Sequence, residues 1–545
     1  MRRYMVLALL LATGLGGCSK LATTDASADR RHAYTIAHEL RFSMGADIAG
    51  LNPLINGSGY EMALAQLTMA FLIRTDALGE PSVPELITRI PTQKNGDVSA
   101  DGKTIIWHLR RGVAWSDGVP FTADDVVFST RAVLNPLNNV VSRDGWDLIK
   151  KIEEPDKYTV VYRLRKPYGA YAVTFFSTAG ADPAVMPKHL LAGYESLNRA
   201  PYNALPVGIG PFKYQSWKRG ESVTMIANPR YFRGRPKLDR VVFKIVPDRN
   251  TVLELLRTHE IDLWSSVPPH FLPEVRKIPG VIVSMSNSFF FDHLDFNLSH
   301  PALADRAVRL ALRYATDRKA INNKIRFGLY QLSESTVPPA SKFYDASIPT
   351  VPFDIGAANA ILDRAAWARG LDGVRSKNGV RLSLDFVSSS GSPDTDQEIE
   401  MIRGWWKQVG VEINVKHYPA ALMFAPIQDG GIVYTGKFDV IAFAWGTDPN
   451  QDLANLYSCA RFPPNGQNDL RYCSRAVTVA IEKAQRMYDR TARRGLMNLI
   501  QERIFADAPT IVLDVRRDIQ AYNGDLKGWN PRSLAPFDDM MGVDI

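Results

Sequence analysis

The sequence predicts an α/β fold made of two or three packed units. Its 545 residues are too many for a single hydrophobic core. Hydrophobic residues make up 46% of the chain and charged residues 22%, which is ordinary for a globular protein. Apolar runs of strand length and segments of helical spacing follow one another along the chain, as α/β folds require.

The expected elements can be read in order. Strands are expected at 34–38 and 40–44, and a helix at 61–72, where apolar residues recur at helical spacing. Glycine and proline mark the turns between later elements. Further strands are expected at 104–109, 212–217, 223–227, 241–246 and 438–445, and further helices at 251–257 and 302–324.

A capping motif predicts where another helix starts. Thr122 is a good N-cap residue, and Asp125 follows three residues later, as in a capping box. The apolar run 126–128 comes next and gives the helix a face to bury. Capping therefore accounts for the carboxylate pair Asp124 and Asp125 without any catalytic role.

Residues 437–450 contain the first candidate binding residue. The run 438–445 is apolar and aromatic-rich, and Gly446 and Pro449 end it. A buried strand is thus expected to deliver Asp448 to a loop, which is where ligands commonly bind in α/β sheets. A carboxylate held there beside an indole suits a cationic group such as a free amino terminus. The other interpretation is that Asp448 caps a turn, since Asp-Pro favours turns.

The first seventeen residues are typical of a targeting signal. Two arginines precede an apolar run at 6–12, which is too short to span a bilayer. Leu-Gly-Gly-Cys18 is similar to the lipobox of bacterial lipoproteins, which implies cleavage after residue 17 and lipidation of Cys18. The following residues, 18–34, are expected to form a tether. The other interpretation is an ordinary secretory signal with a chance cysteine.

Two further cysteines, Cys459 and Cys473, flank one loop rich in proline, glycine and asparagine. An exported protein lies in an oxidising compartment, so these cysteines are expected to form a disulfide. Closing a loop of about 15 residues stabilises a protein by roughly 3 kcal/mol in the chain-entropy model. A metal site would need more ligands, and no histidine lies near, so neither a metal nor another cofactor is expected.

Several function classes find no support in the sequence. The formal net charge of +8 is spread along the chain, and no basic run of the kind that binds nucleic acid stands out. After the leader, no segment has eighteen uninterrupted apolar residues. The sequence contains no phosphate-binding glycine loop, no His-Glu-x-x-His and no Gly-x-Ser-x-Gly. We therefore do not expect an enzyme.

A longer motif carries a family resemblance. Residues 101–129 read DGKTIIWHLRRGVAWSDGVPFTADDVVFS and resemble the signature of solute-binding protein family 5. This family comprises extracytoplasmic receptors of ABC importers for oligopeptides, dipeptides, nickel and related solutes. The resemblance extends from about residue 35 to the end of the chain. Other segments that fit its pattern are 51–54, 207–214, 228–236, 260–262, 305–312 and 506–511.

The resemblance implies a two-lobed periplasmic-binding-protein fold of the class with an inserted subdomain, and a ligand cleft between the lobes. Strands near residues 286 and 509 would form the hinge, and the ligand would stabilise the closed state. The implied boundaries are 35–55, 205–285 and 510–545 for lobe I, 56–204 for the inserted subdomain, and 286–509 for lobe II.

The resemblance also assigns site residues. In peptide-binding members, the aspartate of a Trp-x-x-Asp motif pairs with the ligand's α-ammonium, and Asp448 stands at that place here. The ligand-binding residues implied are Trp445, Gly446, Thr447 and Asp448 of this motif, and Gly57, Ser58 and Tyr60 of a loop that lines the cleft. The alternative interpretations are that Trp445 forms a wall of the core and that the loop is a plain turn without ligand contact.

The implied function is a lipid-anchored, monomeric, extracytoplasmic receptor that binds peptides and delivers them to an ABC permease with its ATPases. One alternative keeps the fold but changes the solute to a nickel chelate, haem, an oligosaccharide or an opine-like compound. A second is a lipoprotein receptor or chaperone without transport. A third is a secreted hydrolase, which a peptide-hydrolysis assay would reveal.

Overall fold

The computed structural model describes residues 31–56, 59–76, 79–140, 142–179, 183–425, 427, 430–530 and 535–545. The expected signal peptide and Cys18, most of the tether, and Gly57 and Ser58 lie outside these residues. No helix in the described part is both long and apolar enough to cross a bilayer.

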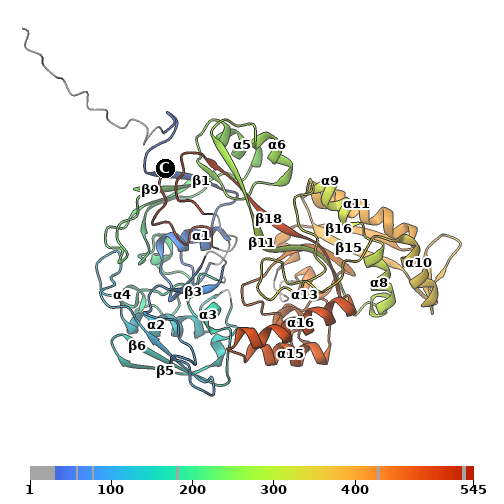
Figure 1. Ribbon diagram of the computed structural model, residues 1–545, viewed down its shortest axis with the longest axis horizontal. Coiled ribbons are helices and arrows are strands. Elements are labelled where there is room, and N and C mark those ends of the chain that lie inside the picture. The colour runs from blue at the N-terminus through green and yellow to red at the C-terminus, as the bar shows by residue number, and fades with distance from the viewer. Residues whose placement is uncertain are drawn as a thin grey trace, which may run out of the picture.

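One ten-stranded mixed sheet runs through both lobes (Figure 1). Its strands in spatial order are β16 (Glu412–Tyr418), β15 (Ser383–Ser389), β17 (Val440–Gly446), β11 (Val281–Phe296), β18 (Thr510–Asn523), β10 (Leu263–Trp264), β1 (Glu39–Met44), β9 (Arg240–Ile245), β8 (Ser222–Ala227) and β7 (Phe212–Lys218). The second lobe therefore builds on one side of the β11–β18 pair and the first lobe on the other.

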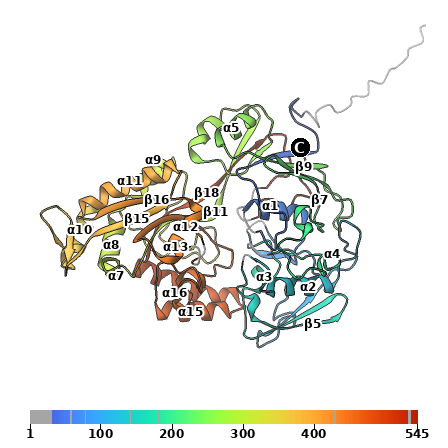
Figure 2. The ribbon, with the colours of Figure 1, turned by 180° about the vertical axis from the view of Figure 1, so that it is seen from behind.

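The two central strands cross from lobe to lobe. β11 and β18 are the longest strands and pair antiparallel, with Val281 opposite Asn523 at one end and Asp295 opposite Thr510 at the other. Their register shifts between Asn287 and Phe291. Such an irregularity disrupts the hydrogen-bond ladder locally, so the two strands that join the lobes are not paired evenly along their length. The ribbon shows this pair crossing the centre of the molecule (Figures 1 and 2).

Helices cover the second lobe on both faces of its strands. One core joins β11, β15 and β17 to four helices, and a separate cluster holds the C-terminal helix pair. The four helices are α8 (Arg306–Tyr314), α9 (Arg318–Ile325), α10 (Ile355–Arg364) and α11 (Pro393–Gln408), and the pair is α15 (Arg475–Gln485) and α16 (Arg490–Asp507).

The first lobe packs α1 (Gly59–Thr68) and the C-terminal residues 535–545 against β1, β8 and β9. Helices α5 (Arg249–Arg257) and α6 (Leu272–Val275) pack in a different cluster, which includes Trp264, Ile519 and Ala521. The strands of this lobe are thus buried by two groups of elements, as strands of an α/β sheet usually are.

The inserted region has a core of its own. A three-stranded sheet orders β4 (Thr104–His108), β6 (Thr159–Leu164) and β5 (Ile149–Asp156), and β2 (Ile73–Thr75) pairs with β3 (Pro81–Pro84). Helix α2 (Ala123–Leu134) begins at the expected cap, where the Asp125 carboxylate accepts a hydrogen bond of 3.0 Å from the Thr122 amide. Buried Trp107, Trp115 and Trp146 fill this core.

Two expectations about elements were wrong. Residues 34–38 form turns rather than a strand, and the first strand is β1. The expected helix 302–324 is broken into α7 (Pro301–Ala304), α8 and α9. The breaks occur because Asp305 and Asp317 each cap a new helix, accepting hydrogen bonds from the amides of Ala307 and Ala320.

Candidate functional site

A cleft of about 710 Å³ lies between the two lobes and the inserted region. Its size is that of a site for a small ligand or short peptide. The walls come from α1, from segments within 142–144 and 168–179 of the inserted region, from residues within 444–467 of the second lobe, and from Phe290 and Pro536. Parts of the chain that are far apart in sequence therefore meet at this cleft.

Strand β17 presents an open edge to this cleft. It pairs with β11 along its whole length, from Val440 to Gly446. On its other side it pairs with β15 only at Val440 and Ile441. In the described part of the chain, no strand pairs with that side of residues 442–446. Since Ala444, Trp445 and Gly446 line the cleft, their backbone is placed where an extended ligand can pair with it.

Asp448 lies at the end of this edge and lines the cleft. Its Oδ1 accepts a hydrogen bond of 2.7 Å from the Gln451 amide. Asp448 therefore does cap a turn, as one interpretation of the sequence expected, through this oxygen. No ion pair with a basic side chain forms within the described residues. The nearby buried guanidinium of Arg493 instead donates to the Asn450 carbonyl at 2.6 Å. Backbone hydrogen bonds from Gln451 and Asn450 hold Asp448, and its charge has no basic side chain as an ion-pair partner in the described part of the chain.

The surroundings of Asp448 favour a positive ligand. Burial and the neighbouring Asp452 carboxylate raise the pKa of Asp448 to about 6, although Arg493 opposes the shift. Asp144 and Asp452 also line the cleft, and no lysine, arginine or histidine does so among the residues that the structure describes. A cation entering the cleft would relieve the repulsion between these carboxylates.

Trp445 is half-buried and matches both interpretations made from the sequence, a ligand contact and a wall of the core. It lines the cleft, and it also packs against a small cluster of Phe291, Val512 and Val515. Phe290 lines the cleft as well and is 41% exposed, whereas Phe289 and Phe291 are buried. Thr447 lines the cleft with its hydroxyl donating to the Phe289 carbonyl at 3.0 Å.

Tyr60 is not among the residues that line this cleft. Its ring packs against the core of the first lobe, and its hydroxyl approaches Gly45 so closely that a Cβ there would lie 2.6 Å away. The wall is formed instead by Gly59, Met62, Ala63 and Gln66 of the same helix. These residues recur at helical spacing, but the helix is buried almost all round, so its sequence does not show which face turns toward the cleft.

A second cavity, of about 580 Å³, meets the first at Phe290 and Ala444. It carries the basic residues Arg249, Arg326, Arg516 and Arg517, which the sequence analysis did not single out. Arg516 is held by Asp292 through two hydrogen bonds of 2.9 and 2.6 Å. The two cavities therefore differ in character, with carboxylates in the first and arginines beside carboxylates in the second.

Buried carboxylates at the second cavity and directly beside it form an ionisable cluster. Burial raises the pKa of Glu398 to about 7, while Arg326, which donates to it at 2.8 Å, opposes the shift. Asp514 is fully buried, and its pKa is well above the usual range for the same reason and because Asp292 lies beside it. Burial and the proximity of like charges thus make the charged forms of both groups unfavourable.

Cys459 and Cys473 are joined by a disulfide, as expected from the sequence. The loop that it closes contributes Gln467 to the wall of the cleft. The disulfide thus constrains a loop that forms part of the cleft wall.

Known proteins resemble this chain over most of its length. A family model described as bacterial extracellular solute-binding proteins, family 5 Middle, matches residues 82–466. The oligopeptide-binding protein AppA of Bacillus subtilis is 23% identical over 531 residues, which cover 96% of this chain and 94% of that protein. The dipeptide-binding protein of Escherichia coli is 25% identical over 464 residues, which cover 79% of this chain and 83% of that protein.

Solved structures show the same two-lobed fold. NikZ from Campylobacter jejuni, in complex with Ni(L-His), matches with a TM-score of 0.78 at 26% identity and covers 92% of this chain and 98% of its own. AppA from Bacillus subtilis, in complex with a nonapeptide, matches with a TM-score of 0.78 at 22% identity and covers 93% of this chain and 98% of its own. The chain therefore belongs to the bacterial extracellular solute-binding proteins of family 5.

Proposed function

We propose that the protein is the extracytoplasmic receptor of an ABC importer and binds peptides in the cleft between its lobes. The observation that carries this proposal is the position of Asp448, a carboxylate without an ion pair at the end of an open strand edge. Relatives named for oligopeptide and dipeptide binding support the same class of ligand. The protein itself performs no chemistry on the solute.

The peptide lies extended along residues 442–446 of β17. Its backbone pairs with the open edge of the strand, which gives affinity with little dependence on side chains. The free α-ammonium lies beside Asp448, and Trp445, Gly446 and Thr447 form the adjacent wall. From there the peptide runs toward the second cavity, where arginine side chains suit its carboxyl end. Tyr60 is left out of this contact because it packs into the first lobe.

The decisive experiment replaces Asp448 by alanine and measures peptide affinity by calorimetry. Binding of peptides with a free amino terminus should weaken by about 1.5–3 kcal/mol, or about 10- to 150-fold, because a charge-assisted contact is lost. N-acetylated versions of the same peptides lack the ammonium and serve as the matched control. Equal weakening for both ligand forms would contradict the assigned role.

Anchoring and partners complete the proposal. Cys18 carries the lipid, residues 18–34 tether the receptor to the membrane, and the partners are an ABC permease and its ATPases. We propose that the receptor acts as a monomer, with lobe boundaries near residues 286 and 509. Metabolic labelling with a radioactive fatty acid, compared with Cys18→Ser, tests the anchor.

A non-peptide solute is the second candidate. It is favoured by the likeness to NikZ, whose solved structure holds Ni(L-His), at an identity similar to that of the peptide-binding relatives. Native mass spectrometry of the purified protein would distinguish the two. A co-purifying peptide mass supports the first proposal, whereas a metal chelate or opine-like mass supports the second.

A further inference from the structure

A third cavity, of about 480 Å³, lies where the inserted region meets the first lobe. Four arginines line it, Arg74, Arg110, Arg111 and Arg233, together with a single carboxylate, Glu85. None of its lining residues lines either of the two cavities between the lobes. Its chemistry is therefore separate from that of the ligand cleft.

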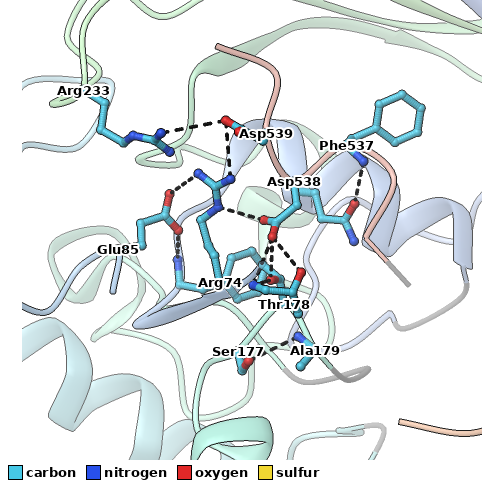
Figure 3. A network of polar contacts seen from close by, with 12 residues as sticks. Arg74, Glu85, Ser177, Thr178, Ala179, Arg233, Phe537, Asp538 and Asp539 are labelled. Atoms are coloured by element: carbon cyan, nitrogen blue, oxygen red, sulfur yellow. Dashed lines mark hydrogen bonds and ion pairs between the residues drawn. The ribbon is translucent and has the colours of Figure 1, made fainter. Parts of the chain in front are cut away.

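Arg74 forms the floor of this cavity and is already paired. Its guanidinium donates to Asp538 at 3.0 Å and lies 3.8 Å from Glu85 and 3.7 Å from Asp539 (Figure 3). Asp538 also accepts hydrogen bonds from the hydroxyls of Thr75 and Thr178. This network connects the C-terminal segment to the inserted region. Arg74 therefore has a structural role, because its guanidinium is already paired with protein carboxylates.

The carboxylate of Glu85 is occupied as well. Its Oε2 accepts a hydrogen bond of 3.0 Å from the Phe71 amide, and its Oε1 accepts one of 3.0 Å from the Tyr231 hydroxyl. Burial raises the pKa of Glu85 even though Arg74 opposes the shift. Glu85 therefore offers little free negative charge to the outer arginines.

The three outer arginines keep donors available. Arg110 donates its Nε to the backbone carbonyl of Glu85 at 2.9 Å and lies 5.5 Å from the centre of the Phe232 ring. Arg111 lies 4.9 Å from the ring of Tyr158. Within the described residues, neither forms an ion pair, and Arg233 approaches only Asp539, at 3.8 Å. The planar guanidinium groups of Arg110 and Arg111 are thus oriented by ring contacts, and their terminal N–H groups form no ion pair with a carboxylate within the described residues.

We propose that this cavity binds a phosphate group. Guanidinium groups match the oxygens of phosphate in pairs, and several of them around one concavity repel each other until an anion is bound. The phosphate can come from a free inorganic ion or from the headgroup of an anionic phospholipid, and the experiment separates the two sources. The site is independent of the solute in the cleft.

The test measures inorganic phosphate binding to the full chain by calorimetry in a phosphate-free buffer of low salt. The double variant Arg110→Ala/Arg111→Ala should bind about 100-fold more weakly, because each of the two charge-assisted contacts accounts for about a factor of ten. Arg235→Ala is the matched control: it lies in the loop of Arg233 but pairs with Asp239 and does not line the cavity. Arg111→Gln, at an exposed side chain, replaces the double variant if that variant does not fold.

Vesicles of phosphatidylglycerol supply the lipid arm, with sedimentation of the wild-type chain compared with that of the same variants. If the double variant binds phosphate more weakly than the wild type but sediments equally with the vesicles, the ligand is a soluble anion. If the wild type sediments with the vesicles more than the variants do, and neither binds inorganic phosphate, the ligand is a phospholipid headgroup. Absence of both effects, or equal phosphate affinity in the double variant and the wild type, overturns the proposal.

Discussion

The side-chain carboxyl of Asp448 has a pKa of about 6, which is close to neutral pH. The proposed ammonium contact needs the carboxylate ionised, and an α-amino group with a pKa of about 7.7–8.0 protonated. Affinity for peptides should therefore be greatest between about pH 6 and 8 and fall by about tenfold per unit below pH 6. Calorimetric titrations from pH 5 to 8 would measure this profile.

The control for that profile is Asp448→Asn, which keeps an acceptor for the Gln451 amide but cannot ionise. Its affinity should be lower at neutral pH and nearly constant between pH 5 and 7. If the variant shows the same acid loss as the wild type, another group controls the pH dependence, and Glu398 with its pKa of about 7 becomes the first candidate.

Asp448→Asn should also change stability in the opposite direction to binding. The folded-state pKa of Asp448 is raised above its usual value of 3.8, so the ionised carboxylate opposes folding above about pH 6. This unfavourable contribution disappears as the pH falls toward 4. The ligand-free variant should therefore melt at a higher temperature than the wild type at pH 7.5, and by a smaller margin at pH 4.5. A lower melting temperature at pH 7.5 would show that the electrostatic attraction of nearby Arg493 outweighs burial.

The residues of the site could be predicted from sequence only in part. Trp445, Gly446, Thr447 and Asp448 follow from a single apolar run and the residues that end it. Their placement in a cleft was a prediction that needed the resemblance, because the opposite wall comes from distant parts of the chain. Tyr60 was assigned because its loop resembles a cleft-lining loop of the family, yet its neighbours on α1 line the cleft instead, and only tertiary packing decides which helix face does so.

At the scale of elements, local patterns predicted strands β1, β4, β7, β8, β9 and β17 and the capped start of α2, since these depend on neighbours in sequence. The region 302–324 shows where such reasoning fails. Its apolar spacing continues across Asp305 and Asp317, but each aspartate caps a new helix, and the chain changes direction at both. Tertiary structure also decides that β17 pairs with β15 at only two of its residues. This short pairing leaves the open strand edge on which the binding proposal depends.

The disulfide-closed loop is the element whose contribution can be measured most simply. Cys459 and Cys473 are 14 residues apart, and closing such a loop should stabilise the fold by about 3 kcal/mol. Replacing both by serine should lower the free energy of unfolding by about this amount in urea titrations. Adding reductant should have the same effect on the wild type and none on the variant. A stability loss near zero would mean that the loop is held by its own packing.

At the scale of the whole molecule, the cleft is closed by contacts that do not involve a ligand. Helices α15 and α16 of the second lobe lie beside the inserted region in both views (Figures 1 and 2). The Tyr488 hydroxyl donates to the Gly102 carbonyl at 2.8 Å, and Arg490 forms an ion pair of 2.7 Å with Glu80. These contacts stabilise the closed state and should break when the lobes separate about the β11–β18 pair.

Tyr488→Phe removes one of these contacts at a residue that does not line the cleft. A ligand that binds only the closed state loses affinity when that state is less populated, so peptide binding should weaken by about 2- to 10-fold. Small-angle scattering should show a larger radius of gyration for the ligand-free variant and the wild-type value once peptide saturates it. Tyr194→Phe, at an exposed tyrosine of the inserted region, is the matched control and should change neither quantity. Unchanged affinity in Tyr488→Phe would mean that the ligand alone holds the lobes together, and that the contacts between them form only after it has bound.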